Sequence, residues 1–184
     1  PAIVVDGPAT HDFEILRQQL PFGLRVIEGV DHAHSVNRIL LDANRAVGRR
    51  RPLAPAGQAE TIAALKRAGL RFTGRPGQIA VLRRGGTKVA FVGFAPYPWA
   101  QQLTDIPAAR RLVKKAVANA DVVIVTMHAG AEGTDHTHVA PGTETYLGEN
   151  RGNVVAFSHA VVDSGADIVI GHGPHVLRGM EWYK

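Results

Sequence analysis

The chain has 184 residues, of which 45% are hydrophobic and 20% are charged, and it contains no cysteine. This length and composition fit about one globular domain and exclude a disordered tail. Without cysteine, a thiol nucleophile and a cysteine-ligated zinc site are excluded. No apolar run approaches the ~20 residues of a membrane helix, so no membrane span is expected within these residues. Because the chain starts at Pro1, a signal or anchor ahead of it is left open.

The charge is unevenly distributed along the chain. Residues 1–90 carry 14 Lys and Arg against 7 Asp and Glu, whereas residues 91–184 carry 7 against 9. A basic surface can attract an anionic polymer, a nucleic acid or a phosphorylated substrate. No basic motif interleaved with aromatic residues, of the kind that RNA-binding surfaces use, is present. We therefore expect the basic side chains to be solvated, and we expect no nucleic-acid partner.

The first 57 residues give the weakest pattern. Ala2–Val5 could form a short strand, and Phe13–Leu20 places apolar residues on one helical face. Val47–Pro55 is a run of Arg and Pro with no pattern that builds a core.

From residue 56 the pattern is regular. Residues 58–69 predict a helix that stops at Gly69, and residues 70–73 predict a strand. Residues 78–82 and 87–94 predict two strands joined as a hairpin through Gly85 and Gly86, because glycine takes the positive φ of a tight turn.

Two further segments lead towards the most informative part of the chain. Residues 95–99 predict a rigid loop, which would either pack against the sheet edge, our preferred interpretation, or offer an aromatic platform to a substrate. Residues 107–120 predict an amphipathic helix. Its inward-facing residues are expected to be Leu112, Val113, Ala116 and Val117.

The second half contains two apolar, β-branched runs that each stop at a histidine. Val122–His128 is the first, and Asp167–Gly171 followed by His172 is the second. Between them, Asn153 is suited to capping a helix and Gly165 to ending it. Such a strand–helix–strand unit places both strands in one parallel sheet, and open α/β sheets bind ligands at the carboxyl edge of the strands.

Three histidines are expected at that edge: His128, His172 and His175. Neutral imidazole is a good ligand for zinc, iron, manganese or nickel. Pro174 makes the turn between the last two rigid, so that both could face one ion. Taken singly, each histidine is better explained structurally, with His172 and His175 as turn residues bonded to the backbone and His128 as the cap of a strand. For the three together we favour a metal site.

A long segment, residues 130–152, follows the first of these histidines. It is rich in Gly, Thr and charged residues, and loops of this length are usually functional or disordered. We expect it to lie over the metal edge and to face the substrate. His136 and His138 within it are expected to be solvated.

Two motifs carry a family resemblance. They are His128-x-Gly130-x-Glu132 and the segment from Ser164 to Glu181 that contains Gly-His-Gly-Pro-His. Both resemble the CapA family of capsule and poly-γ-glutamate biosynthesis proteins, which looks like a branch of the calcineurin-like metallophosphoesterases. The resemblance implies one domain over residues 1–184, matching poorly over 1–57 and well over 58–184. The implied fold class is α/β, a layered α/β/β/α sandwich with mixed sheets, incomplete at both ends.

The same resemblance implies a metal-dependent hydrolase of the phosphoesterase type. His128, His172 and His175 would bind a divalent Mn, Fe or Zn ion, and Glu132, at the family's acidic position, would be the catalytic residue that orients a histidine or binds the substrate. The implied substrate is a phosphate ester or an anionic polymer, the implied partner is the capsule-synthesis machinery, and the implied location is the cell envelope.

The chain departs from this family pattern near its start. CapA-like proteins are expected to carry an early Gly-Asp element and an Asn-Asn-His loop with further metal ligands. The nearest match to the loop, residues 43–48 around Asn44, lacks the histidine, and His32 and His34 could substitute. Divergence of this segment or a misread stretch of gene would both explain the departure. Two alternative functions stay open: a non-catalytic accessory protein that binds an anionic cell-surface polymer, and a metal-dependent γ-glutamyl amidase.

Overall fold

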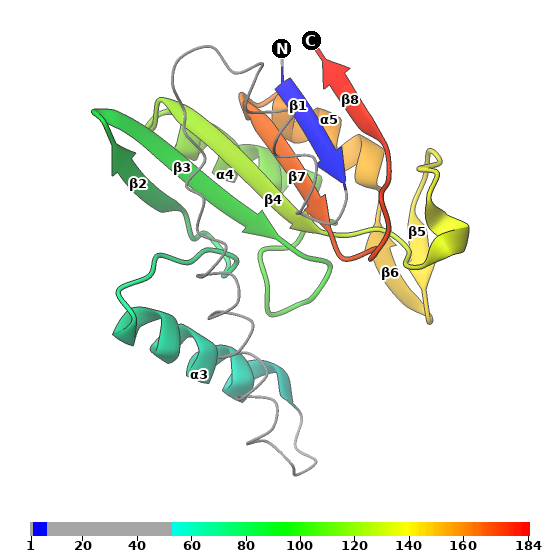
Figure 1. Ribbon diagram of the computed structural model, residues 1–184, viewed down its shortest axis with the longest axis horizontal. Helices are drawn as coiled ribbons and strands as arrows, with labels where there is room; N and C mark the ends of the chain where they lie inside the picture. The colour runs from blue at the N-terminus through cyan, green and yellow to red at the C-terminus, as the bar shows by residue number, and fades with distance from the viewer. Residues whose placement is uncertain (1, 7–52) are drawn as a thin grey trace. The chain divides into compact units, whose positions relative to one another are not determined.

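The computed structural model describes residues 2–6 and 53–184. The chain forms two compact units. One consists of residues 1–8 with 71–184, and the other of residues 9–70. Within the described ranges, no helix is long and apolar enough to cross a membrane. Figure 1 gives the labels of the elements.

The described part of the smaller unit is one helix, α3 (Leu53–Arg67). It confirms the helix predicted over residues 58–69 and begins five residues earlier. Gly69 follows it with a φ of 70°, and Leu70 N–H donates to Leu65 O at 2.9 Å. Glycine adopts this left-handed conformation without a steric penalty, which is why the helix ends there.

The larger unit is built on a six-stranded mixed sheet. Its strands are, in spatial order, β2 (Ala80–Arg84), β3 (Thr87–Phe94), β4 (Val122–His128), β7 (Ile168–His172), β1 (Ala2–Asp6) and β8 (Met180–Tyr183). The four inner strands run parallel, while β2 and β8 pair antiparallel at the two edges. This arrangement confirms the predicted α/β class with a mixed sheet. It also confirms the short strand expected at Ala2–Val5.

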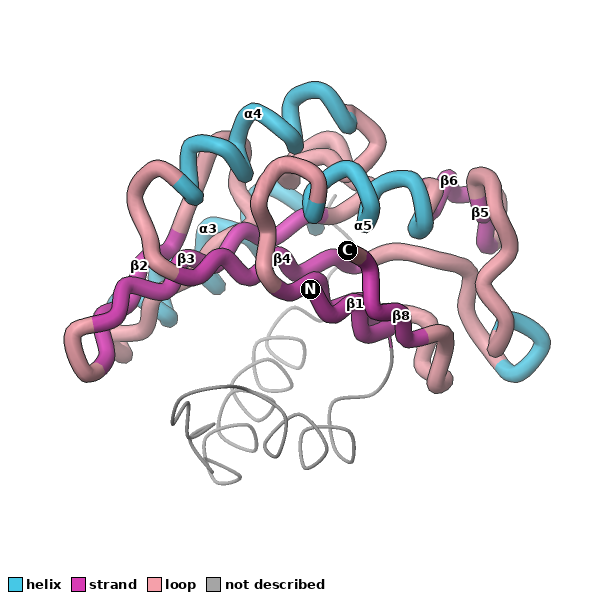
Figure 2. Tube along the Cα trace, turned by 90° about the horizontal axis from the view of Figure 1, so that it is seen from above, coloured by secondary structure: helices cyan, strands magenta, loops and turns pink. Residues whose placement is uncertain are grey.

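Two helices cover one face of this sheet, as Figure 2 shows. They are α4 (Ile106–Val117) and α5 (Val154–Val162). The alternate residues Val123, Val125 and Met127 of β4 are buried beneath them, and the Phe94 and Phe157 rings meet edge to face at 5.0 Å. Alternation with a period of two therefore leaves the other side chains of β4, which end at His128, on the opposite face.

The helix ends are set by local polar groups. Asn153 accepts a hydrogen bond from Ala156 N–H at 2.9 Å and caps α5 as predicted, and Asp105 caps α4 in the same way through Ala108 N–H. Of the residues expected to face inward on α4, Val117 is the exception, because it is 40% exposed. Val117 is the last residue of the helix, and its side chain lies next to Gly165.

The hairpin predicted through Gly85 and Gly86 is confirmed, with φ values of 55° and 89°. The strand predicted over residues 70–73 is wrong. Thr73 Oγ1 donates to Gln78 O and accepts from Gly93 N–H, while the Gln78 side-chain amide donates to Phe72 O. The segment is therefore a loop that is held by hydrogen bonds to Gln78 and Gly93.

The segment from residue 130 to 152 is not a structureless loop. It contains a single turn of 3-10 helix, η1 (Thr134–His136), and a two-stranded hairpin, β5 (Glu144–Tyr146) with β6 (Glu149–Gly152). Leu147 and Gly148 form the turn, both with positive φ. Gly130 N–H donates to Arg151 O at 3.0 Å, which brings the end of β6 beside the end of β4.

Candidate functional site

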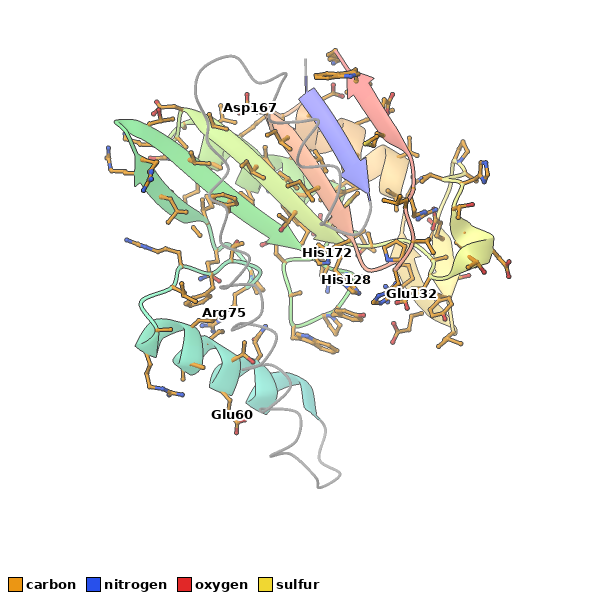
Figure 3. All side chains as sticks on the ribbon, in the orientation of Figure 1. Glu60, Arg75, His128, Glu132, Asp167 and His172 are labelled. Atoms are coloured by element: carbon orange, nitrogen blue, oxygen red, sulfur yellow. The ribbon has the colours of Figure 1, made fainter. Side chains whose placement is uncertain are left out.

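The site is centred on the carboxyl ends of β4 and β7. These strands are adjacent and parallel, and His128 lies directly opposite His172 in the register. The two Nδ1 atoms are 3.3 Å apart, and the rings meet edge to face with centroids 5.2 Å apart. Figure 3 shows both residues at the end of the sheet away from Asp167. The sequence prediction that these two histidines share one edge is therefore confirmed by their positions.

Gly173 makes room for this pair. Its φ is 114°, and a Cβ atom at this position would lie 2.9 Å from Cε1 of His128. Non-glycine residues rarely adopt this φ, and the close contact would push the imidazole away. The glycine inside the Gly-His-Gly-Pro-His motif therefore allows the His128 ring to approach the turn after β7.

His175, the third predicted ligand, is turned towards a different partner. Its backbone is left-handed, with a φ of 62°, and its side chain is 77% exposed. Its Nε2 lies 3.7 Å from Oε2 of Glu132. Within the described residues, no three His, Asp or Glu side chains are grouped closely enough to hold a metal ion. The structure thus pairs two of the three predicted histidines and places the third beside Glu132.

The sequence analysis missed the residue that connects this site, Arg151. Its side chain is only 3% exposed, and all of its N–H groups face acceptors. Nε donates to Gly130 O at 3.1 Å, one terminal nitrogen lies 3.2 Å from the Tyr97 hydroxyl, and the other lies 3.0 Å from Nε2 of His128 and 2.8 Å from Glu132. A single Arg in a Gly-rich segment carries no signal of such burial. Arg151 is buried because the β5–β6 hairpin folds back beside the end of β4.

Glu132, the predicted catalytic residue, is held within this network. Its carboxylate accepts from Arg151 through one oxygen and faces His175 through the other. Its side chain keeps 22% exposure. Glu132 thus lies between the buried Arg151 and the exposed His175, at hydrogen-bond distance from the first only.

Both paired histidines have a lowered pKa. Burial lowers the pKa of His128 below 6.5, and the neighbouring charge of Arg151 lowers it further. Burial alone lowers the pKa of His172, whose ring is packed on one side although the residue retains an exposed surface. Both shifts favour the uncharged imidazole, which is the form that can accept a hydrogen bond or bind a metal.

The aromatic loop after β3 also reaches this site. Tyr97 stacks on Trp99 with an interplanar angle of 2°, and its ring centroid lies 6.0 Å from that of His128. A bridge between Ala95 and Gln102 closes the loop directly after the end of β3. The Tyr97 side chain therefore packs beside His128, and both interpretations of residues 95–99 stay predictions.

A second buried arginine anchors the segment that surrounds the site. Both terminal nitrogens of Arg178 bond the Glu144 carboxylate, at 2.9 and 2.8 Å, and the Arg178 side chain is 1% exposed. Glu144 also accepts from Ala131 N–H at 2.6 Å. A Cβ on Gly130 would collide with the Arg178 guanidinium. This ion pair ties the turn after β4 to the segment after β7.

The remaining residues considered in the sequence analysis are His32, His34, Asn44, His136 and His138. His32, His34 and Asn44 lie outside the described residues. His138 is exposed, as expected for a solvated residue, and His136 is half-buried. One position that the sequence analysis overlooked is Asp6, the last residue of β1, which lies in register with Gly171 at the same edge of the sheet.

The paired histidines fit a divalent cation by donor type and spacing. Two nitrogens bound at 2.0–2.1 Å to a tetrahedral zinc ion are about 3.3–3.4 Å apart, the separation seen between the two Nδ1 atoms. Uncharged imidazoles are the form that binds. An ion between the two Nδ1 atoms would replace their direct contact, while Arg151 lies at the other ring nitrogen of His128, Nε2.

Comparison with known proteins places this site in a family. The family described as "Bacterial capsule synthesis protein PGA_cap" matches residues 53–184, which include every histidine and arginine of the site. The chain belongs to this family.

Individual relatives of this capsule synthesis family agree at low identity. The capsule biosynthesis protein CapA of Bacillus anthracis is 38% identical over 66 residues, covering 36% of this chain and 13% of that protein. A "probable polyglutamine synthesis accessory protein" of Mycobacterium tuberculosis is 28% identical over an alignment of 155 residues, covering 70% of this chain and 37% of that protein. The chain thus spans well under half the length of either relative. The predicted CapA resemblance is confirmed.

Proposed function

We propose that this capsule-synthesis-family chain carries the centre of a metal-dependent hydrolase of the phosphoesterase type. The observation that supports this function is the pair of uncharged imidazoles, 3.3 Å apart, at the carboxyl ends of two adjacent parallel strands. Side chains placed at this edge are the usual ligand-binding groups of open α/β sheets.

In this proposal His128 and His172 hold a divalent Mn, Fe or Zn ion, with His175 available from the exposed turn beside them. Such an ion, when bound, supplies a Lewis acid for a phosphoryl oxygen and lowers the pKa of a water molecule. Glu132, 3.7 Å from His175, would orient this histidine once the two side chains close to hydrogen-bond distance. Arg151 donates to Glu132 and holds this carboxylate in place.

The proposed substrate is a phosphate ester or an anionic intermediate or polymer of capsule or poly-γ-glutamate assembly. The family description and the printed name of the CapA relative support this class. A γ-glutamyl amidase would use the same histidines and differ only in the bond that is cleaved. By the same association, the proposed place of action is the cell envelope, with the capsule-synthesis machinery as partner.

The decisive measurement is bound metal per chain. Dialysed protein should retain about one ion per chain by elemental analysis. A triple alanine variant at His128, His172 and His175 should retain none. His159→Ala removes a histidine on α5 and should leave the metal content unchanged. Activity on a chromogenic phosphodiester that persists after chelation would contradict the proposed mechanism.

A second function is favoured by one specific observation. His175 faces Glu132 and does not join the other two histidines, so the described residues offer only two imidazoles to one ion. The name of the mycobacterial relative is that of an accessory protein. On this alternative the chain binds an anionic polymer without cleaving it. Binding of poly-γ-glutamate that is unchanged in His172→Ala would support the accessory function, whereas loss of binding would favour the metal site.

A further inference from the structure

The contacts of Arg151 and His128 fix where the protons of the histidine pair lie. An arginine guanidinium carries five N–H donors and no acceptor. Its terminal nitrogen lies 3.0 Å from Nε2 of His128, so this Nε2 must be the acceptor and cannot carry a hydrogen. The one hydrogen of the uncharged ring is then on Nδ1, the atom that faces His172.

The same reasoning extends to the second ring. Nδ1 of His128 lies 3.3 Å from Nδ1 of His172, and only one of these atoms can donate. Because His128 donates there, Nδ1 of His172 accepts, and the hydrogen of His172 is on Nε2. The three residues form a chain of hydrogen bonds with one direction, running from Arg151 through His128 to His172.

We infer that Arg151 acts as a built-in competitor of metal binding: its hydrogen bond to His128 and an ion between the two histidines exclude one another. With Arg151 bound, the only lone pair of His128 is occupied at Nε2, and Nδ1 carries a hydrogen in the place of an ion. An ion at Nδ1 requires the hydrogen to move to Nε2, where it would face an arginine N–H. Arg151 must then release His128.

The surroundings of Arg151 make this release possible without leaving its charge unpaired. The nitrogen that contacts His128 also bonds Glu132 at 2.8 Å, and the remaining donors keep Gly130 O and the Tyr97 hydroxyl. Arg151 itself gives up only its hydrogen bond to His128, while the ion replaces the hydrogen bond between the two histidines. The guanidinium therefore remains compensated within the same buried site, which makes Arg151 a positioning residue for His128.

This inference rests on the proposed function for its metal, but its first test needs no metal. In metal-free protein labelled with ¹⁵N-histidine, long-range ¹H–¹⁵N spectra distinguish protonated from unprotonated ring nitrogens. His128 should have an unprotonated Nε2 and His172 an unprotonated Nδ1, with assignments from His128→Gln and His172→Gln. In Arg151→Met the preference at His128 should be lost. A protonated Nε2 on His128 in the unaltered protein would overturn the inference.

The second test is the affinity for Zn²⁺ or Mn²⁺ by calorimetry. Removing one hydrogen bond that competes with the ion should tighten binding roughly 3- to 10-fold in Arg151→Met. In Arg151→Met the Glu132 carboxylate loses its partner, and its negative charge could itself attract the ion. The double variant Arg151→Met/Glu132→Gln removes this charge as well, and the gain in affinity should persist in it. Arg111→Met, on the exposed side of α4, removes a remote arginine and should have no effect.

The outcomes distinguish a failure of the proposed competition by Arg151 from a failure of the proposed metal site. A gain that disappears in the double variant, or no gain at all, would overturn the competition while leaving the metal site intact. If no ion binds to the unaltered protein or to any variant, the proposed function fails and the competition with it, whereas the ring-nitrogen spectra still decide whether Arg151 sets the protons. Arg151→Lys, which keeps the charge, provides a second variant should Arg151→Met fold poorly.

Discussion

Polar side chains lie at both ends of the strands of the central sheet, at the amino edge and at the carboxyl edge. The hydrogen-bond partners of these side chains differ between the two. At the amino edge, Asp121 and Asp167 each precede a strand and close onto the neighbouring one. The carboxylate of Asp167 accepts from Val123 N–H at 2.8 Å while its own N–H donates to Val123 O, and Asp121 makes the same pair of bonds with Lys88. These carboxylates satisfy backbone groups that the strand ends would leave without partners.

At the carboxyl edge, the side chains bond mainly to one another. His128, His172, Glu132 and Arg151 form a connected network, and of these contacts only the one to Gly130 O involves the backbone. Figure 3 shows His128, His172 and Glu132 at one end of the sheet and Asp167 at the other. The comparison teaches that polar residues at strand ends are structural where the backbone uses them, and are candidates for function where it does not.

The largest expected effect is on the ion pair that holds the carboxyl edge together. Arg178→Met leaves the Glu144 carboxylate without its guanidinium partner and should lower the free energy of unfolding by about 3–5 kcal/mol, because an uncompensated charge stays buried. Urea unfolding measures this loss. In Arg178→Met/Glu144→Gln the charge is gone, while the amide oxygen can still accept from Ala131 N–H. A double variant as unstable as the single one would contradict this explanation.

The second prediction concerns the space beside His128. Gly173→Ala should destabilise the protein by about 1–3 kcal/mol through backbone strain, and more through the contact with the His128 ring. Gly142→Ala is a matched control, since its φ of 118° is nearly the same but nothing lies within 4 Å of its new Cβ. The difference between the two variants in thermal unfolding isolates the contact. Equal losses would mean that the ring moves aside at no cost.

The third prediction exchanges one residue on each edge. Asp167→Ala should cost about 1–3 kcal/mol, because Val123 N–H loses its acceptor, and should leave metal binding unchanged. His172→Ala should change stability by no more than about 0.5 kcal/mol, as expected for an exposed residue, and should abolish metal binding. Chemical unfolding and calorimetric metal titration of both variants test this pair. The reverse pattern would remove the functional distinction between the edges.

The smallest expected effect is a dependence of stability on pH in the metal-free protein. Burial lowers the pKa of His128 and His172 in the folded chain, with Arg151 adding to the shift at His128, so the unfolded chain binds protons at a higher pH. The free energy of unfolding should therefore fall as pH drops from about 6.5 through the folded pKa values. Urea unfolding between about pH 5 and 8 measures the slope. His128→Gln/His172→Gln should flatten it, and an unchanged slope would assign it to other groups.

Local sequence signals determined the helices α3, α4 and α5 and the strands β1, β2, β3, β4 and β7 of this protein, whereas β5, β6 and β8 were not predicted. The apolar run of β4, the cap at Asn153 and the glycine pair between β2 and β3 are local signals, and each element formed where its signal lies. Periodicity and capping act over a few residues, so they can be read without knowing the path of the chain. For the same reason His128 and His172 could be placed at one edge in advance.

Only the tertiary structure decided how these residues are connected. Arg151 lies 23 residues from His128, and Arg178 lies 34 residues from Glu144. Neither arginine occupies a distinctive position in the sequence, and their burial depends on where the β5–β6 hairpin and the turn after β7 fold back. The left-handed backbone of His175 likewise turned a predicted ligand towards Glu132. Contacts between distant segments depend on the whole chain path, which local patterns do not encode.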